Sequence, residues 1–257
     1  MRIEARYNIQ DILTKLAQLG VFTIKDAVKA TGLKEIEVKL LLPKLRKRGF
    51  IERIEKGKYF VIPPKIDITL NEYIVANLLV KPSAVAYWSA LSFHEFTEQI
   101  PQITYVQTTS RKKKQELEIF GIKYKIVRIK PEKFFGFQYV WIESYFGRFR
   151  VCVTDKEKTI VDCLDKPRYC GGIAEVIKAL ETRNYNVKRL SEYAIRLGNS
   201  AVIRRLGYLC DALNIEIELP QVKTRNYVIL DPTLPKQGKV VSKWRIIDNV
   251  GVLDESQ

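Results

Sequence analysis

Residues 34–62 read KEIEVKLLLPKLRKRGFIERIEKGKYFVI, and this stretch decides how the N-terminal quarter of the chain is predicted to fold. Its apolar residues at helical spacing are Val38, Leu41, Leu42 and Leu45. That spacing predicts a helix over about 34–48, which Gly49 ends. Residues 50–62 are typical of two short strands around Lys56-Gly57. The stretch therefore predicts a helix followed by a β-hairpin.

Two more helices are predicted before this one. Residues 8–20 carry apolar side chains at helical spacing and end at Gly20, a common residue after a helix. Thr23 is predicted to cap a second helix, which Gly32 ends. Three short helices followed by a hairpin are the order of elements in a winged helix-turn-helix. In that fold the third helix enters the major groove of DNA and the hairpin touches the backbone.

Positive charge is concentrated in the same region. The 257 residues hold 44 Lys and Arg against 29 Asp and Glu, a formal net charge of +15. Residues 1–64 hold 14 Lys and Arg against 7 Asp and Glu, so a quarter of the chain carries nearly half of the excess positive charge. With 46% hydrophobic and 28% charged residues, the composition excludes disordered and low-complexity classes. A basic surface of this kind attracts polyanions such as nucleic acid.

We predict that seven cations of the N-terminal domain contact duplex DNA, four on or beside the third helix and three on the hairpin. They are Lys34, Lys39, Lys44, Lys47, Arg53, Lys56 and Lys58. The helix face offered to base edges would hold Ile36, Glu37, Lys39 and Leu40. It lacks the Arg, Asn and Gln that make bidentate base contacts. Pro43 is predicted to kink or break the helix. A winged helix that contacts only protein stays an alternative.

The fold class predicted for the whole chain is α+β, in three regions. Residues 1–64 form the winged helix-turn-helix domain, and Pro63-Pro64 marks its end. Residues 65–153 form a mixed α+β middle region, in which Ser83 is a predicted N-cap. Residues 154–257 form a helix-rich C-terminal region packed with the middle region.

Residues that could carry chemistry are few. The four cysteines form no C-x-x-C pair and are predicted to be small buried thiols, and His94, the only histidine, is predicted to pack near a helix end. Thr154 and Glu157 have the spacing of a capping box. An alternative use of that segment is a metal-dependent nuclease with Asp155, Glu157 or Asp162. We predict that the protein is not an enzyme and that it binds neither a cofactor nor a metal ion.

The protein is expected in the cytoplasm. No stretch approaches the roughly 18 apolar residues that a membrane span needs. The first ten residues, MRIEARYNIQ, also lack the apolar core of a signal peptide.

Segments spread over the whole chain match one known family in order and spacing. They are Tyr87-Trp88-Ser89-Ala90-Leu91 with His94, Thr97-Glu98-Gln99-Ile100-Pro101, Lys133-Phe134-Phe135-Gly136, Thr154-Asp155-Lys156-Glu157-Lys158-Thr159 with Asp162, Pro167-Arg168-Tyr169 with Gly171-Gly172, Leu206-Gly207-Tyr208-Leu209, and Leu230-Asp231-Pro232 with Trp244-Arg245 and Asn249. With these segments the sequence resembles the AbiEi-type antitoxins, transcriptional regulators of abortive-infection (type IV toxin–antitoxin) operons, a class of antiviral defence system.

The resemblance implies an N-terminal winged helix that represses its own operon by binding inverted repeats in the promoter. A homodimer on DNA fits such repeats. It also implies a C-terminal region that counteracts a nucleotidyltransferase-like toxin, with or without direct contact between the two proteins. It supplies no catalytic residue. An interaction module in residues 65–257, with DNA binding secondary, stays an alternative function.

Overall fold

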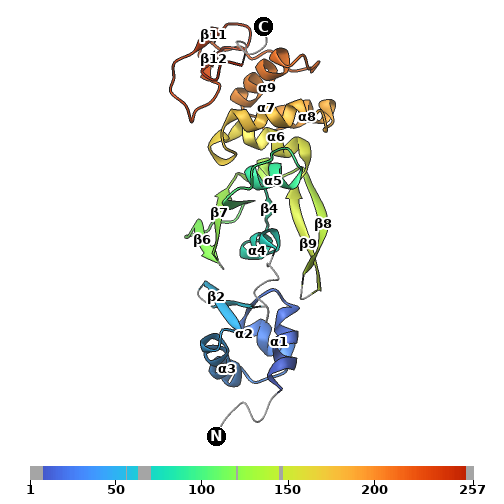
Figure 1. Cartoon of the computed structure of the whole chain (residues 1–257), viewed down its shortest axis with the longest axis vertical. Coiled ribbons are helices and arrows are strands. Elements are labelled where there is room, and N and C mark those ends of the chain that lie inside the picture. Colours follow the sequence, from blue (N-terminus) through green and yellow to red (C-terminus); the bar gives the residue numbers. More distant parts are fainter. Residues whose placement is uncertain (1–7, 56, 63–70, 120, 145–146, 253–257) are drawn as a thin grey trace. The chain divides into compact units, whose positions relative to one another are not determined.

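The computed structural model of the chain describes residues 8–55, 57–62, 71–119, 121–144 and 147–252, and it has an α+β fold (Figure 1). The chain divides into two compact units. The first unit comprises Met1–Leu79 and Trp141–Val151, and the second comprises Val80–Val140 and Cys152–Gln257. The predicted boundary at residue 64 lies outside the described residues, so the three predicted regions stay a prediction.

The first unit begins with short helices and strands. They are α1 (Ile9–Ala17), β1 (Val21–Thr23), α2 (Ile24–Thr31), α3 (Glu35–Lys47), β2 (Ile51–Glu55), β3 (Lys58–Val61) and α4 (Glu72–Leu79). The three strands form an antiparallel sheet in the order β1-β3-β2. Helices α1 to α3 and strands β2 and β3 confirm the elements predicted for this stretch, whereas β1 was not predicted.

Local capping explains where the first two helices begin. The Asn8 side chain accepts hydrogen bonds from the backbone amides of Gln10 and Asp11 at the start of α1. At the start of α2, Thr23 and Asp26 form a reciprocal capping box. Gly32 ends α2 in the left-handed conformation, with φ 72°, which glycine adopts without steric cost.

Helix α3 continues through Pro43, so the prediction of a break there is wrong. Proline removes one backbone donor, which leaves the carbonyl four residues earlier, that of Lys39, without its helical partner. Both residues lie on the exposed side of the helix, where water can bond that carbonyl. The helix therefore stays continuous over its 13 residues.

The second unit is built on a six-stranded mixed sheet in the order β6-β7-β5-β4-β9-β8. The strands are β4 (Ala84–Val85), β5 (Ile103–Thr108), β6 (Glu116–Ile119), β7 (Ile122–Arg128), β8 (Phe137–Ser144) and β9 (Gly147–Thr154), and residues 141–151 of the last two belong to the first unit. Strands β5 and β7 pair in parallel, and β6 pairs antiparallel to β7. The short helix α5 (Trp88–Phe93) packs on β5.

Four helices follow the sheet, and α6 lies at their centre. They are α6 (Lys156–Asp165), α7 (Ile173–Glu181), α8 (Val187–Arg196) and α9 (Ser200–Ala212). The other three all pack against α6, as Figure 1 shows. A small sheet in the order β10-β12-β11 closes the described chain, with β10 (Val228–Ile229), β11 (Lys239–Val241) and β12 (Ile246–Asp248).

Two cap predictions for the second unit are wrong. Ser83 precedes strand β4 and does not cap a helix, because the helix starts five residues later at Trp88. At α6 the N-cap is Asp155, whose carboxylate accepts from the Lys158 amide at 2.8 Å. The Thr154 hydroxyl bonds the Thr159 hydroxyl instead. The predicted capping box fails because Thr154 and Glu157 both bond other partners, the Thr159 hydroxyl and the Asn186 amide.

None of the helices in the described part of the chain is long and apolar enough to cross a membrane.

Candidate nucleic-acid interface

Helix α3 is held in place by an apolar inner stripe. The stripe packs with α1, α2 and the sheet, and its members are Val38, Leu41, Leu42 and Leu45. At the start of the helix, the Glu37 carboxylate accepts from the Lys34 amide at 2.9 Å. Because four positions are locked in the core, the opposite face of the helix must point to solvent.

The exposed face of α3 carries most of the predicted DNA contacts. Lys34, Lys39, Lys44 and Lys47 are all exposed, as the prediction requires. Lys39 pairs with Glu35 at 2.6 Å, and this contact lowers the pKa of the Glu35 carboxyl. Within the part of the chain that the structure describes, Lys44 and Lys47 have no ion-pair partner. No carboxylate among the described residues therefore neutralises these two lysines.

The hairpin of β2 and β3 adds two described cations. Arg53 is exposed on β2, opposite Tyr59, and Lys58 is half-buried at the start of β3. The predicted contact at Lys56 lies outside the described residues. Helix α3 packs against β2, and Arg46 of that helix bonds Glu52 of that strand at 3.3 Å. The fold thus brings six of the seven predicted residues into one compact unit.

Sequence reasoning missed a further exposed surface of the first unit, in residues 141–151. Trp141 is 60% exposed, and the Arg148 guanidinium lies 5.4 Å from the centre of its ring. Arg148 also bonds Glu143 at 2.9 Å, and Arg150 is exposed on the same strand. The alternation of arginine with apolar residues in 148–151 is the signal that could have found this surface.

The acidic residues of the nuclease alternative have structural partners. Asp155 caps α6, Glu157 accepts from the Asn186 amide at 2.6 Å, and Asp162 pairs with Lys158. Burial raises the pKa of the Asp162 carboxyl, although Lys158 acts in the opposite direction. Among the described residues no group of three or more His, Cys, Asp or Glu could hold a metal ion. These three carboxylates therefore make hydrogen bonds and an ion pair that hold α6 and the start of α8 in place.

His94 and the cysteines are buried, as predicted. His94 is the C-cap residue of α5, and its Nε2 lies 2.7 Å from the Thr154 carbonyl oxygen. A carbonyl only accepts, so Nε2 carries the hydrogen. Burial lowers the pKa of His94, which favours the neutral ring. All four cysteines are buried, and burial raises the pKa of Cys210 to about 12.

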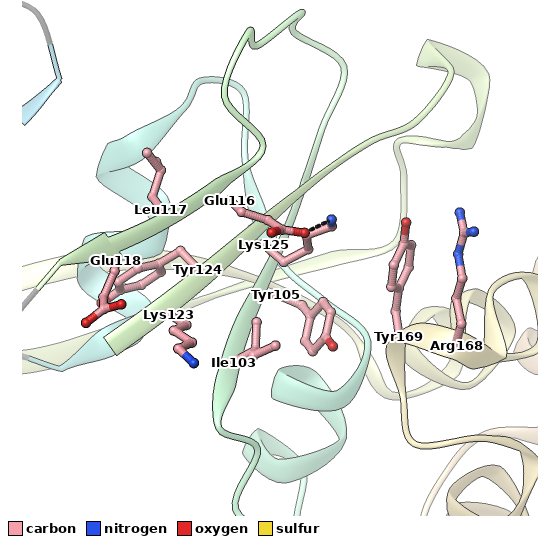
Figure 2. A pocket seen from close by; sticks show the side chains of 10 residues that line it. All are labelled: Ile103, Tyr105, Glu116, Leu117, Glu118, Lys123, Tyr124, Lys125, Arg168 and Tyr169. Carbon is pink, nitrogen blue, oxygen red and sulfur yellow. Dashed lines mark hydrogen bonds and ion pairs between the residues drawn. The ribbon is translucent and has the colours of Figure 1, made fainter. Parts of the chain in front are cut away.

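The second unit has a cavity of about 550 Å³ on its sheet (Figure 2). Tyr105 and Tyr169 line it with their ring centres 5.7 Å apart, and the Arg168 guanidinium lies 4.7 Å from the Tyr169 ring. The strand charges balance in cross-strand pairs, Glu116 opposite Lys125 and Glu118 opposite Lys123. Such pairs are usual on a solvent-facing sheet, so we assign this cavity no ligand.

Comparisons with known proteins give information about the fold and none about the function. The sequence matches no protein-family model, and no curated protein matches it. The structure is similar to the crystal structure of the RV2827C protein from Mycobacterium tuberculosis, with a TM-score of 0.64 and 15% sequence identity. The similarity covers 96% of this chain and 93% of that chain. The two chains therefore share one α+β architecture over nearly their whole lengths.

Proposed function

We propose that the N-terminal part of the first unit is a winged helix-turn-helix that binds duplex DNA, and that the protein represses its own operon. Two features of the fold support this. The element order α1-β1-α2-α3-β2-β3 and the antiparallel sheet β1-β3-β2 match the arrangement of a winged helix. In that arrangement α3 is the helix that enters the major groove, and the β2–β3 hairpin is the wing.

The outward charge of α3 is the observation that carries the proposal. Lys44 and Lys47 point away from the apolar core, and no described carboxylate pairs with either. The core fixes the direction of the helix, so these charges cannot turn inward. A regular row of phosphates is the partner that neutralises such a surface.

Each candidate has a role in this proposal. Lys34, Lys39, Lys44 and Lys47 contact phosphates beside the major groove, and the wing contacts the backbone through Arg53, Lys56 and Lys58. Such contacts set the position of a protein on DNA without reading its sequence. Two copies would bind a site with two-fold symmetry.

The test is binding of the full-length protein to its own upstream DNA at several salt concentrations, measured by fluorescence anisotropy. The logarithm of the binding constant should fall linearly with the logarithm of salt concentration. The slope should be about −0.9 per phosphate contact, or about −6 if all seven proposed cations take part. Absence of binding, or an affinity indifferent to salt, would contradict the proposal.

We propose further that the protein is an antitoxin of the AbiEi type. The resemblance of segments along the whole chain supports this role, and no catalytic residue is assigned. Co-expression with the product of the adjacent gene tests it. The wild-type protein should restore growth. If the region after the winged helix is what neutralises the toxin, a Lys44→Ala, Lys47→Ala variant should restore growth equally well. Failure of the wild-type protein to restore growth would contradict the antitoxin role.

A further inference from the structure

Two large apolar side chains stand exposed on the outer face of α3. Ile36 is 67% exposed and Leu40 is 53% exposed, and they lie one helical turn apart. Burial of the inner stripe keeps both side chains out of the core. Leaving apolar surface in water forgoes a favourable free energy, so an adjacent exposed pair on a helix is a feature to explain.

Lysines continue the same stripe of the helix. Leu40 is followed at helical spacing by Lys44 and Lys47, both exposed and without an ion-pair partner among the described residues. The stripe is thus apolar in the first half of α3 and cationic in the second. This charge complements a polyanion, which favours DNA over an apolar protein surface as the occupant.

Few polar groups are available for base readout in the first half of α3. The Glu37 carboxylate accepts from the Lys34 amide, and Lys39 is paired with Glu35. In a helix-turn-helix the N-terminal residues of the recognition helix meet the base edges. Apolar side chains there can contact the C5-methyl group of thymine, a group that no other DNA base carries.

We infer that Ile36 and Leu40 read thymine methyl groups in the major groove. This inference rests on the proposed DNA binding, and it deepens that function by naming what α3 selects. Sequence preference then comes from apolar contact at thymines, while Lys44 and Lys47 hold the neighbouring phosphates. Each methyl group buried against these side chains should strengthen binding about fourfold, the equivalent of ~0.8 kcal/mol for one buried methylene.

The test uses deoxyuridine, which differs from thymidine only in lacking the C5-methyl group. The full-length protein first selects a preferred duplex from a random-sequence pool, and that duplex is made with thymidine or with deoxyuridine. The wild-type protein should bind the deoxyuridine duplex about fourfold to fifteenfold more weakly. The Ile36→Ala, Leu40→Ala variant should bind both duplexes alike. Both side chains are exposed, so this variant should fold normally.

Two control variants separate apolar contact from charge and from truncation in general. Lys44→Ala with Lys47→Ala should weaken binding to both duplexes and keep their ratio. Ile100→Ala removes a 90% exposed apolar side chain in the second unit and should change neither affinity.

Each contrary outcome has a distinct meaning. Equal, salt-dependent binding of the two duplexes by the wild-type protein would overturn the inference and leave the proposed DNA binding standing. Persistence of the ratio in the Ile36→Ala, Leu40→Ala variant would overturn it too, because DNA shape would then be what is read. If the Ile36→Ala, Leu40→Ala variant changed only the oligomeric state, these two side chains would form a protein interface, which also overturns the inference. Absence of salt-dependent binding to any duplex would remove the proposed function itself.

Discussion

Two ion pairs with the same helical spacing show how differently the two units use charge. In α3 of the first unit, Glu35 and Lys39 pair with their side chains 59% and 57% exposed. In α6 of the second unit, Lys158 and Asp162 pair at 0% and 4% exposure. The first pair lies in water and is screened by salt, whereas the second forms part of a protein core.

The difference extends beyond these pairs. Among the described residues, every buried polar or charged side chain belongs to the second unit. The buried residues of the first unit's N-terminal core are all apolar. None of the described charged side chains of the first unit is therefore buried, whereas several charged side chains of α6 and α9 lie inside the fold. Substitutions of charged residues should affect binding in one unit and stability in the other.

The largest expected effect is the loss of Asp162. Asp162→Ala leaves the Lys158 ammonium buried without its carboxylate, which should lower the free energy of unfolding by about 3–5 kcal/mol. Chemical denaturation followed by circular dichroism measures it. Glu35→Gln removes the matched exposed pair in α3 and should leave stability unchanged. Replacing both partners, Lys158→Met with Asp162→Leu, should cost less than Asp162→Ala. Equal effects of Asp162→Ala and Glu35→Gln would contradict the comparison.

A smaller difference is expected between helix caps. Asp231 is buried, and its carboxylate accepts from the Ile173 amide at 2.6 Å and from the Thr233 amide at 2.8 Å. Asp231→Ala should destabilise the protein by about 2–3 kcal/mol, because it leaves the buried backbone amide of Ile173 without its acceptor. Asn8→Ala, at the exposed cap of α1, should cost about 1 kcal/mol. Denaturation of both variants tests the order, and a larger effect of Asn8→Ala would reverse it.

The smallest effect concerns the pH dependence that His94 contributes. Burial holds the pKa of His94 below its usual 6.5 in the folded protein, so the unfolded chain binds the proton more readily. The stability that neutral His94 provides is present above pH 6.5 and is lost as pH falls from 6.5 through the lowered pKa. Denaturation midpoints between pH 7.5 and 5 should fall less for His94→Gln than for the wild type. Identical pH profiles would contradict this role.

The N-terminal fold could be predicted from sequence because its signals are local. The stripe of apolar residues in α3, the Thr23 cap and Gly32 each act within a turn or two of the chain. Strand β1 could not be predicted, because its three residues are too few to show a pattern and it is a strand only through its pairing with β3. The exposed positions of the α3 lysines follow directly from the buried stripe, so the candidate interface was largely predictable.

Interactions between distant residues explain what sequence could not show. Glu157 looked like a capping residue, yet its carboxylate bonds the amide of Asn186, 29 residues away. Asp231 caps α7 from 58 residues further along the chain. No periodicity or spacing encodes such contacts. The burial of Lys158 and Asp162 also depends on the helices that pack on α6, so the residue type of Asp162 alone suggested a metal ligand.

One measurement tests most directly whether the outward charge of α3 is the charge that binds DNA. It compares two variants with the same change of net charge, Lys44→Ala with Lys47→Ala in α3, and Lys236→Ala with Lys239→Ala on the exposed surface of the second unit. The salt dependence of binding to the protein's own upstream DNA is measured for each. The α3 variant should reduce the steepness of the slope by about 2, and the other should leave it unchanged. Equal changes in both variants, or none in either, would contradict the account.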